Sequence, residues 1–260
     1  MSFSKPYTLI TGASGGIGFE LAVIMAEKGH NLIITARSEE KLNNIARQLI
    51  KNHGIDAISI PADLSKSTDR NRLIDEIRRQ NIHIENLINN AGFGDLGAFE
   101  TSDWVKNEEM IQLNITALTH LTREFLPDMR KAKSGRIMNV ASIAAFMPGP
   151  LMSVYYASKA YVLSFSEALA SELAGSGVKI TTLCPGPVET GFQKKAEFKD
   201  PALLKMLKPA TAQELADYGY HSMMNGKRLA IHGWMNRFIV FSLRFSPRWV
   251  VARAIMKLHQ

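Results

Sequence analysis

Tyr155 and Lys159 are the residues whose types and spacing point most directly to chemistry. They stand four residues apart in the run Tyr-Tyr-Ala-Ser-Lys, and residues at this spacing share one face of a helix. A neighbouring cation favours phenolate, so the lysine would lower the tyrosine pKa from its ordinary value of about 10. The pair could then exchange a proton with a substrate oxygen. A solvated lysine beside a buried tyrosine would show the same spacing.

A second group of residues could bind phosphate. The apolar run 7–10 leads into Thr-Gly-Ala-Ser-Gly-Gly-Ile-Gly and then into a helical pattern, which predicts a strand, a glycine turn and a helix. Glycine lets the backbone approach a pyrophosphate closely, and the free N–H groups at a helix start stabilise its charge. The spacing Gly-x-x-x-Gly-x-Gly differs from the commoner Gly-x-Gly-x-x-Gly fingerprint, and a glycine-rich turn need bind nothing.

Alternating strands and helices would have to position these groups. Apolar runs at 32–35, 57–60, 87–89 and 180–183 alternate with helical patterns such as 39–51 and 67–80. This alternation predicts an α/β fold, a doubly wound parallel sheet of about seven strands with helices on both faces. A chain of 260 residues with 46% hydrophobic content fits one domain, residues 1–260. Ligands of such sheets bind at the carboxyl ends of the strands.

Taken together, these motifs resemble the short-chain dehydrogenase/reductase family over residues 7–190. Ser142 lies thirteen residues before Tyr155, and Asn114 lies forty-one before it, which are the spacings of the family's catalytic tetrad. Choosing Tyr156 instead would change the first spacing to fourteen. The resemblance implies a Rossmann-like fold and the catalytic residues Asn114, Ser142, Tyr155 and Lys159.

The same resemblance assigns cofactor contacts to the ends of several predicted strands. It places an adenine contact at Asp63 and a contact with the cofactor's phosphates or carboxamide at Thr190. It also implies that residues 191–211 form a substrate lid, whose Lys194 and Lys195 either attract an anionic substrate or are simply solvated. The predicted cofactor-binding residues are Gly12, Ser14, Gly15, Gly16, Ile17, Gly18, Arg37, Asp63, Leu64, Asn90, Ala91, Gly92, Tyr155, Lys159, Pro185, Gly186, Val188 and Thr190.

Arg37, just beyond the second predicted strand, indicates which nicotinamide cofactor is bound. A carboxylate here would accept from a ribose 2′-hydroxyl and favour NAD, whereas a guanidinium can pair with a 2′-phosphate. Arg37 therefore predicts NADP(H), as it does in NADP-preferring members of the family. A solvated arginine beside Glu39 and Glu40 is the alternative, and the second basic residue that some members carry in the glycine turn is missing.

The function implied by the resemblance is an NADP(H)-dependent oxidoreductase that interconverts a carbonyl and an alcohol. The nicotinamide would deliver hydride while Tyr155 donates a proton to the oxygen that Ser142 holds. Lys159 would lower the Tyr155 pKa and contact the nicotinamide ribose, and Asn114 would steady a water. By analogy the substrate is an apolar ketone of 3-oxoacyl or steroid-like type. The alternative is a non-catalytic sensor or scaffold that binds NADP(H).

The C-terminal extension, residues 233–260, departs from the minimal family pattern. All of the net charge of +7 arises from residue 199 onward, and Trp234, Phe238, Phe241 and Phe245 recur at helical spacing. Ser246 and Pro247 then look like an N-cap and first position of another helix. We expect the aromatic stripe to pack on the domain and roof the substrate pocket; the alternatives are a subunit interface and peripheral contact with an anionic membrane.

Several other classes of protein are excluded or disfavoured. The single cysteine, Cys184, rules out a disulfide framework and is typical of a buried residue in a reducing compartment. No zinc-like spacing of His and Cys is present, so no metal is predicted. No nucleic-acid motif accompanies the basic tail, and the window 238–251 is too short and charged to span a membrane. The start of the chain lacks a signal peptide's apolar core, so we expect a cytoplasmic protein. We also expect a homodimer or homotetramer, with membrane contact, if any, only at the periphery.

Overall fold

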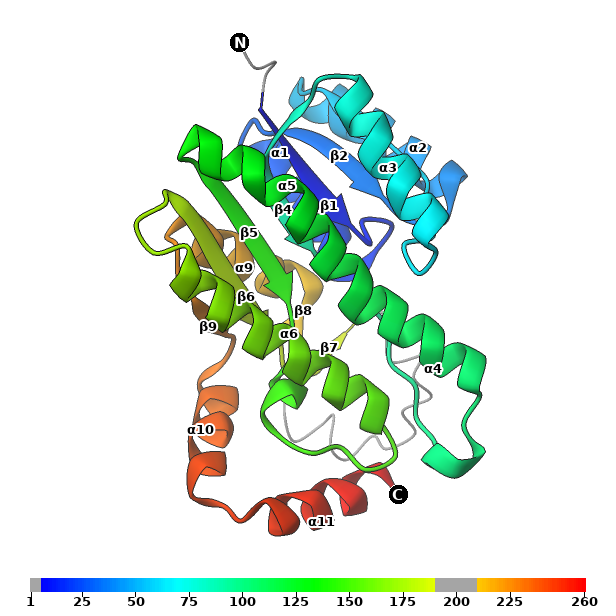
Figure 1. Ribbon diagram of the computed structural model, residues 1–260, viewed down its shortest axis with the longest axis vertical. Coiled ribbons are helices and arrows are strands. Elements are labelled where there is room, and N and C mark those ends of the chain that lie inside the picture. The colour runs from blue at the N-terminus through cyan, green and yellow to red at the C-terminus, as the bar shows by residue number, and fades with distance from the viewer. Residues whose placement is uncertain (1–5, 190–209) are drawn as a thin grey trace.

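A seven-stranded parallel sheet forms the centre of the protein (Figure 1). The computed structural model describes residues 6–189 and 210–260. All neighbouring strands of this sheet are paired in parallel. In sheet order the strands are β3 (Ala57–Ser59), β2 (Asn31–Thr35), β1 (Pro6–Thr11), β4 (His83–Asn89), β5 (Gly135–Val140), β6 (Val178–Cys184) and β9 (Leu229–Ile231).

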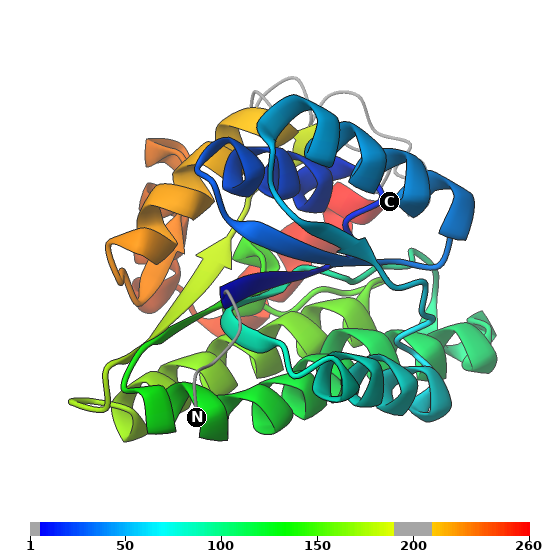
Figure 2. The ribbon, with the colours of Figure 1, turned by 90° about the horizontal axis from the view of Figure 1, so that it is seen from above.

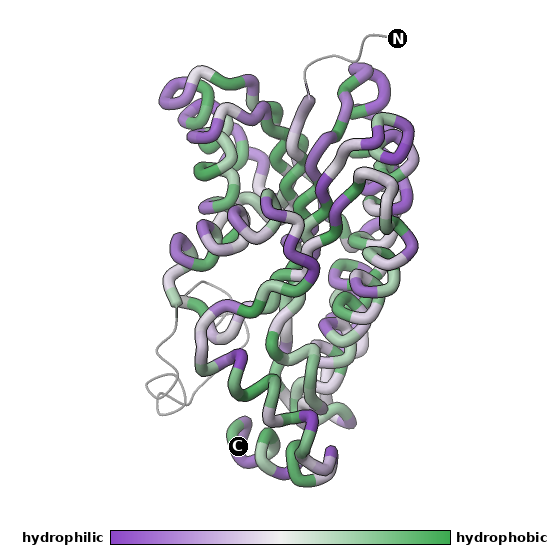
Figure 3. The backbone as a smooth tube through the Cα atoms, turned by 90° about the vertical axis from the view of Figure 1, so that its left-hand side faces the viewer, coloured by the Kyte–Doolittle hydropathy of each residue, from purple (hydrophilic) through white to green (hydrophobic). Residues whose placement is uncertain are grey.

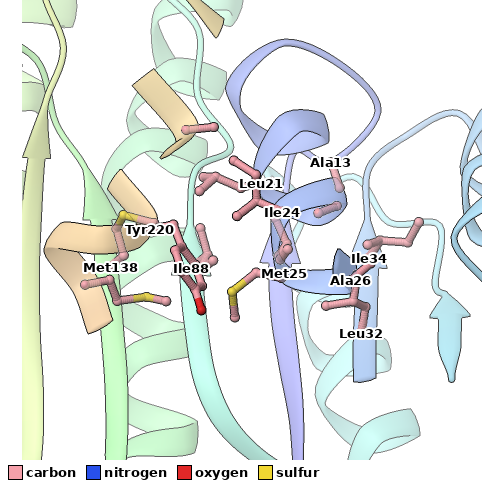
Figure 4. Close-up of a cluster of buried hydrophobic side chains, with 14 of the residues drawn as sticks. Ala13, Leu21, Ile24, Met25, Ala26, Leu32, Ile34, Ile88, Met138 and Tyr220 are labelled. Carbon is pink, nitrogen blue, oxygen red and sulfur yellow. The ribbon is translucent and has the colours of Figure 1, made fainter. Parts of the chain in front are cut away.

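Helices cover both faces of the sheet, as Figure 2 shows. One layer holds α1 (Gly16–Glu27), α2 (Glu39–His53) and α9 (Ala212–Met224), and the opposite layer holds α3 (Ser67–Arg79), α5 (Leu118–Ala132) and α6 (Ser153–Glu172). Each layer closes its own hydrophobic core against the sheet. Figure 4 shows the first of these cores, where Met25 of α1 and Tyr220 of α9 pack over Ile88 and Met138 of the strands. The predicted doubly wound α/β fold is therefore confirmed.

The sheet strands are nearly continuous apolar runs because both of their faces are buried. In β2, for example, Leu32, Ile33 and Ile34 have no exposed surface. The sheet has the expected seven strands, and its last strand, β9, is only three residues long. Two residues of β7 (Val188–Glu189) pair in parallel with two of β8 (Ala210–Thr211) outside the main sheet.

A buried polar chain fixes helix α6 against the centre of the sheet. The Asn89 amide donates to Thr122 on α5 and to Asn139 on β5, and the Asn139 amide donates to Ser166 on α6. The Ser166 hydroxyl in turn donates to the carbonyl of Val162, one turn earlier in α6. Because buried hydrogen bonds are directional, this chain helps to hold the register of α6 over β4 and β5, although Oδ1 of Asn89 has no partner among the described residues.

The C-terminal extension consists of α10 (Trp234–Ser242), the short 3-10 helix η4 (Leu243–Phe245) and α11 (Arg248–His259). The expectation that its aromatic stripe packs on the domain is wrong, since Trp234 and Phe245 are about three-quarters exposed. Amphipathic spacing identifies an apolar face but not what covers it. Ser246 also does not cap α11, because its hydroxyl donates to the carbonyl of Ser242. Among the described residues, no helix combines the length and the apolarity that a membrane span requires.

Candidate active site

The predicted site residues gather at the carboxyl edge of the sheet. After β1 the chain continues to β2 and β3 on one side, whereas β4, β5 and β6 lie on the other, so the direction of winding reverses between β1 and β4. The glycine turn follows β1, Asn90 follows β4, Ser142 follows β5 and Pro185 follows β6. A crevice at such a reversal is where doubly wound sheets bind their ligands.

The glycine turn passes tightly beneath the start of α1. Gly12 has φ +68° and Gly16 has φ +55°, which favour glycine. A Cβ on Gly18 would lie 2.5 Å from the carbonyl oxygen of Gly12 and would also collide with the amide of Asn90. Gly15, in contrast, is exposed, and the atom nearest to a Cβ there would be Nζ of Lys41, at an ordinary contact distance of 3.7 Å. The turn therefore leaves Ser14 to Ile17 as open backbone at a helix N-terminus, which fits a pyrophosphate.

The segment Asn90–Gly92 is tied to the end of β1 through Asn90 and Ala91. The amide of Asn90 donates to the Thr11 carbonyl at 2.9 Å, and the N–H groups of Asn90 and Ala91 both donate to the Thr11 hydroxyl at 2.9 Å. A Cβ on Gly92 would stand 2.9 Å from Oδ1 of Asn114 and 3.4 Å from Nζ of Lys159. This segment thus lies between the glycine turn and the predicted catalytic residues.

Lys41 places a cation beside the glycine turn, and Arg37 lies two residues beyond Thr35, whose carbonyl accepts from the N–H groups of Gly12 and Ala13. Arg37 is exposed beyond β2, and Lys41 is on the first turns of α2. The Lys41 ammonium lies 3.7 Å from where a Cβ of Gly15 would stand. Sequence reasoning missed Lys41, since it sought a second cation inside the turn. The spacing of four residues from Arg37, at the start of a helix, is the signal that could have found it.

The remaining predicted cofactor-binding residues that the structure describes follow β3 and β6, where they make contacts within the protein. The Asp63 carboxylate accepts from the N–H and hydroxyl of Ser65, so it shapes its own turn, and Leu64 is buried. The carbonyl of Pro185 accepts from the N–H of Ile143, which joins the two loops after β5 and β6. Gly186 packs against Asn236 of α10, and Val188 is buried. Thr190 and lid residues 191–209 lie outside the described residues.

Tyr155, Lys159 and Ser142 form one cluster at the start of α6. The Lys159 ammonium is 5.8 Å from the centre of the Tyr155 ring and donates to the Val140 carbonyl at 2.9 Å. The Ser142 hydroxyl bonds the Tyr155 phenol and accepts from the N–H of Ala144 at 3.1 Å. The loop after β5 therefore positions the Ser142 hydroxyl, and helix α6 positions the Tyr155 hydroxyl.

Burial controls the pKa values in this cluster. It raises the pKa of Tyr155 to about 12, and the hydrogen bond from Ser142 lowers that value only in part. Burial also lowers the pKa of Lys159 to about 8. The prediction that the Tyr155 pKa lies below its ordinary value is therefore wrong for the protein alone, because desolvation by burial dominates.

Asn114 lies in a turn of π-helix, η2 (Gln112–Ala117), between α4 (Trp104–Ile111) and α5. Its amide donates to the Phe93 carbonyl at 2.9 Å and to the Ser158 hydroxyl at 3.0 Å, while its Oδ1 accepts from the Phe93 N–H at 3.1 Å. Ser158 in turn donates to the Tyr155 carbonyl. π-turns inside α-helices are frequent at functional sites, and here the turn directs the Asn114 side chain toward α6.

Tyr156 points away from the cluster. Its hydroxyl lies 3.3 Å from Nε2 of His259 on α11, and its ring packs on Gly149. His259 Nδ1 lies 2.7 Å from the Pro150 carbonyl. Tyr156 therefore joins the C-terminal helix to the loop before α6, a contact that sequence reasoning missed. Among the described residues no group of three or more His, Cys, Asp and Glu could hold a metal ion.

The family model described as short chain dehydrogenase matches residues 6–200. The chain belongs to this family. An 11-beta-hydroxysteroid dehydrogenase of Pinus massoniana is 38% identical over 187 residues, which cover 72% of this chain and 52% of that protein. This member of the short-chain dehydrogenases thus spans about half the length of its Pinus relative. The relatives in this family that the comparison names are dehydrogenases, oxidoreductases and a ketoacyl reductase.

Solved structures of other family members share the whole fold. A short-chain dehydrogenase from Sphingobium yanoikuyae in complex with NADPH has 30% identity and a TM-score of 0.82, over 92% of this chain and 94% of that one. A short-chain dehydrogenase/reductase from Burkholderia phymatum in complex with NAD has 25% identity and a TM-score of 0.79, over 94% and 93%. The two relatives therefore differ in cofactor.

Proposed function

We propose that this short-chain dehydrogenase is an NADP(H)-dependent oxidoreductase that interconverts an apolar ketone or aldehyde and an alcohol. The observation that carries the proposal is the cluster of Tyr155, Ser142 and Lys159 beside a phosphate-binding turn. When bound, the nicotinamide supplies or accepts the hydride. The protein must then supply a proton, hold the carbonyl oxygen and exclude water.

Tyr155 is the proposed proton donor in reduction and acceptor in oxidation. Since burial keeps its pKa near 12, the phenol is fully protonated at neutral pH and ready to donate to a developing alkoxide. Ser142 is within hydrogen-bond reach of the phenol and can bond the same oxygen. The buried ammonium of Lys159 stabilises the phenolate that remains after donation.

Arg37 and Lys41 favour NADP(H) over NAD(H). Two cations in this region can neutralise most of the charge of a 2′-phosphate. The ribose 2′-hydroxyl of NAD carries no charge for these cations to pair with. Glu39 and Glu40 also begin α2. The preference for NADP(H) therefore requires that Arg37 and Lys41 pair with the 2′-phosphate and not with these carboxylates. The NADPH complex of the Sphingobium relative supports this choice.

The substrate class is inferred from the relatives and the site's surroundings. The Pinus relative is named as a hydroxysteroid dehydrogenase. A hollow beside Tyr155 is lined by apolar side chains from the loop before α6 (Leu151 and Met152), from α6 (Val154) and from Met110 and Phe99. Its polar lining residues are Asp95, Ser102, Asn107 and Ser153. An apolar ketone would lay its hydrocarbon along the apolar side chains of this hollow, with its oxygen toward the hydroxyl of Tyr155.

The experiment that tests this assignment compares Tyr155→Phe with Tyr156→Phe. Removing the Tyr155 hydroxyl should lower NADPH-dependent turnover of a hydrophobic ketone by on the order of 10²-fold or more, as expected for a general acid. Tyr156→Phe is the matched control, because it removes a neighbouring hydroxyl that faces His259. Near-normal turnover in Tyr155→Phe, or equal losses in both variants, would contradict the assignment.

A further inference from the structure

The C-terminal extension presents an aromatic face to solvent. This face consists of Trp234, Phe238, Phe241, Phe245 and Trp249, each more than half exposed. Large apolar side chains gathered in this way on a protein surface mark an interaction site. The face begins on α10 and continues onto α11, and Figure 3 shows the hydrophobic residues of this segment interrupted by hydrophilic ones.

The charge around the aromatic face has one sign. Residues 218–260 contain seven lysines and arginines and no aspartate or glutamate. The extension itself carries Arg237, Arg244, Arg248, Arg253 and Lys257. None of these five forms an ion pair with a described carboxylate. Their charge is available to an external anionic partner.

Polar contacts near both ends anchor the extension to the domain. Near its start, Arg237 donates to the Ile231 carbonyl at 2.9 Å, and Asn236 packs on Gly186. At its end, His259 lies 2.7 Å from the Pro150 carbonyl and reaches Tyr156. The helices thus form a strap across the carboxyl end of the sheet (Figure 1), while the aromatic face stays exposed.

We propose that the α10–α11 strap docks on the surface of a bilayer that contains anionic phospholipid. Trp and Phe on one face with cations at the borders is the arrangement that interfacial helices use, the rings entering the boundary of the acyl chains and the cations meeting headgroup phosphates. A second copy of the chain fits less well. A symmetric contact would bring two sets of like charges together with no carboxylate of the strap to offset them.

The first test is sedimentation of the full-length protein with vesicles. We expect binding to phosphatidylcholine vesicles that contain phosphatidylserine, weaker binding to phosphatidylcholine alone, and release by salt. The variant Phe238→Ser/Phe245→Ser should abolish binding. Arg244→Gln/Arg248→Gln should weaken it by roughly tenfold or more, since each cation near an anionic surface is worth about 1 kcal/mol.

The matched control for the aromatic variants is Trp104→Ser. Trp104 is 62% exposed, as Phe238 is, but it begins α4 in an acidic setting with Asp103 and Glu108. This variant should bind vesicles as the wild type does. Since all the substituted side chains are exposed, circular dichroism should show an unchanged fold in each variant.

A spectroscopic test needs no disruptive substitution. The chain has three tryptophans, so Trp104→Phe leaves Trp234 and Trp249, both on the aromatic face, as the only reporters. Their emission should shift to shorter wavelength with anionic vesicles and be quenched by brominated lipid. Unchanged emission and no sedimentation would overturn the proposal. An oligomer that dissociates in Phe238→Ser/Phe245→Ser, without vesicle binding, would also overturn it and identify a second copy as the occupant.

Discussion

Gly18→Ala is the substitution whose effect can be worked out most fully from the structure. A methyl group at this position would lie 2.5 Å from the Gly12 carbonyl oxygen and collide with the Asn90 amide. Forced overpacking of this kind costs about 1–3 kcal/mol. Displacing the Asn90 amide also gives up its bond to the Thr11 carbonyl, which is worth about 1 kcal/mol.

One term opposes this loss. Alanine is favoured over glycine inside a helix by about 1 kcal/mol, and Gly18 is within α1. The net loss of unfolding free energy is then about 1–3 kcal/mol by the overpacking estimate. For a chain of this size, each kcal/mol shifts the melting temperature by about 2–4 °C, so we expect a melting point lower by roughly 2–12 °C.

The assay is thermal unfolding without cofactor, followed by titration of NADPH. Gly97→Ala is the matched control, because a Cβ there meets no atom within 4 Å; its unfolding free energy should stay within about 0.5 kcal/mol of wild type. Gly18→Ala should also lose most of the stabilisation that NADPH gives, since the displaced amide borders the phosphate turn. A Gly18→Ala protein as stable as Gly97→Ala would refute the close packing described for this turn.

Three further predictions concern charge and buried polarity. Arg37→Gln should raise the KM for NADPH by about tenfold or more and leave the KM for NADH nearly unchanged, and Lys41→Gln should act in the same direction. Steady-state kinetics with both cofactors measures these values, and equal effects on the two cofactors would contradict the prediction. Burial lowers the pKa of Lys159 from 10.5 to about 8, so between these pH values the unfolded chain binds more protons than the folded one. In urea unfolding, the stability of the wild type relative to Lys159→Met should therefore rise as the pH increases from about 8 to 10.5. A difference in stability that does not change with pH would refute the burial of this ammonium. Asn114→Ala leaves both backbone groups of Phe93 without their partner and should cost about 1–3 kcal/mol of unfolding free energy, whereas a smaller loss would mean that water replaces the amide.

The sheet and its helices could be predicted because strands buried on both faces leave unmistakable apolar runs. Ile33 and Leu87 are fully buried, as their runs indicated, and the two long helices predicted from residues 39 and 67 begin at those residues. The predicted site residues that the structure describes lie at one edge for the same reason, since parallel strands share their carboxyl ends. The roles of these residues remain predictions.

Other features depend on three-dimensional surroundings that a sequence pattern does not contain. The direction of the Tyr155 pKa shift follows from burial, which spacing to Lys159 does not reveal. The π-turn at Asn114 is not contained in the spacing of forty-one residues to Tyr155 by which Asn114 is identified. Lys41 approaches Gly15 only because α2 packs beside the turn. The aromatic stripe of α10 has the correct period, yet period alone does not distinguish a packed face from an exposed one.

Transfer of deuterium from 4-deuterated NADPH to a hydrophobic ketone tests the proposed oxidoreductase most directly. The account predicts deuterium on the carbinol carbon of the alcohol product, a preference for NADPH over NADH, and loss of the transfer in Tyr155→Phe. Tight NADPH binding without transfer to ketones, thioesters or aldehydes, and without reduction of NADP+ by the matching alcohols, would contradict it. The protein would then be a cofactor-binding sensor or scaffold.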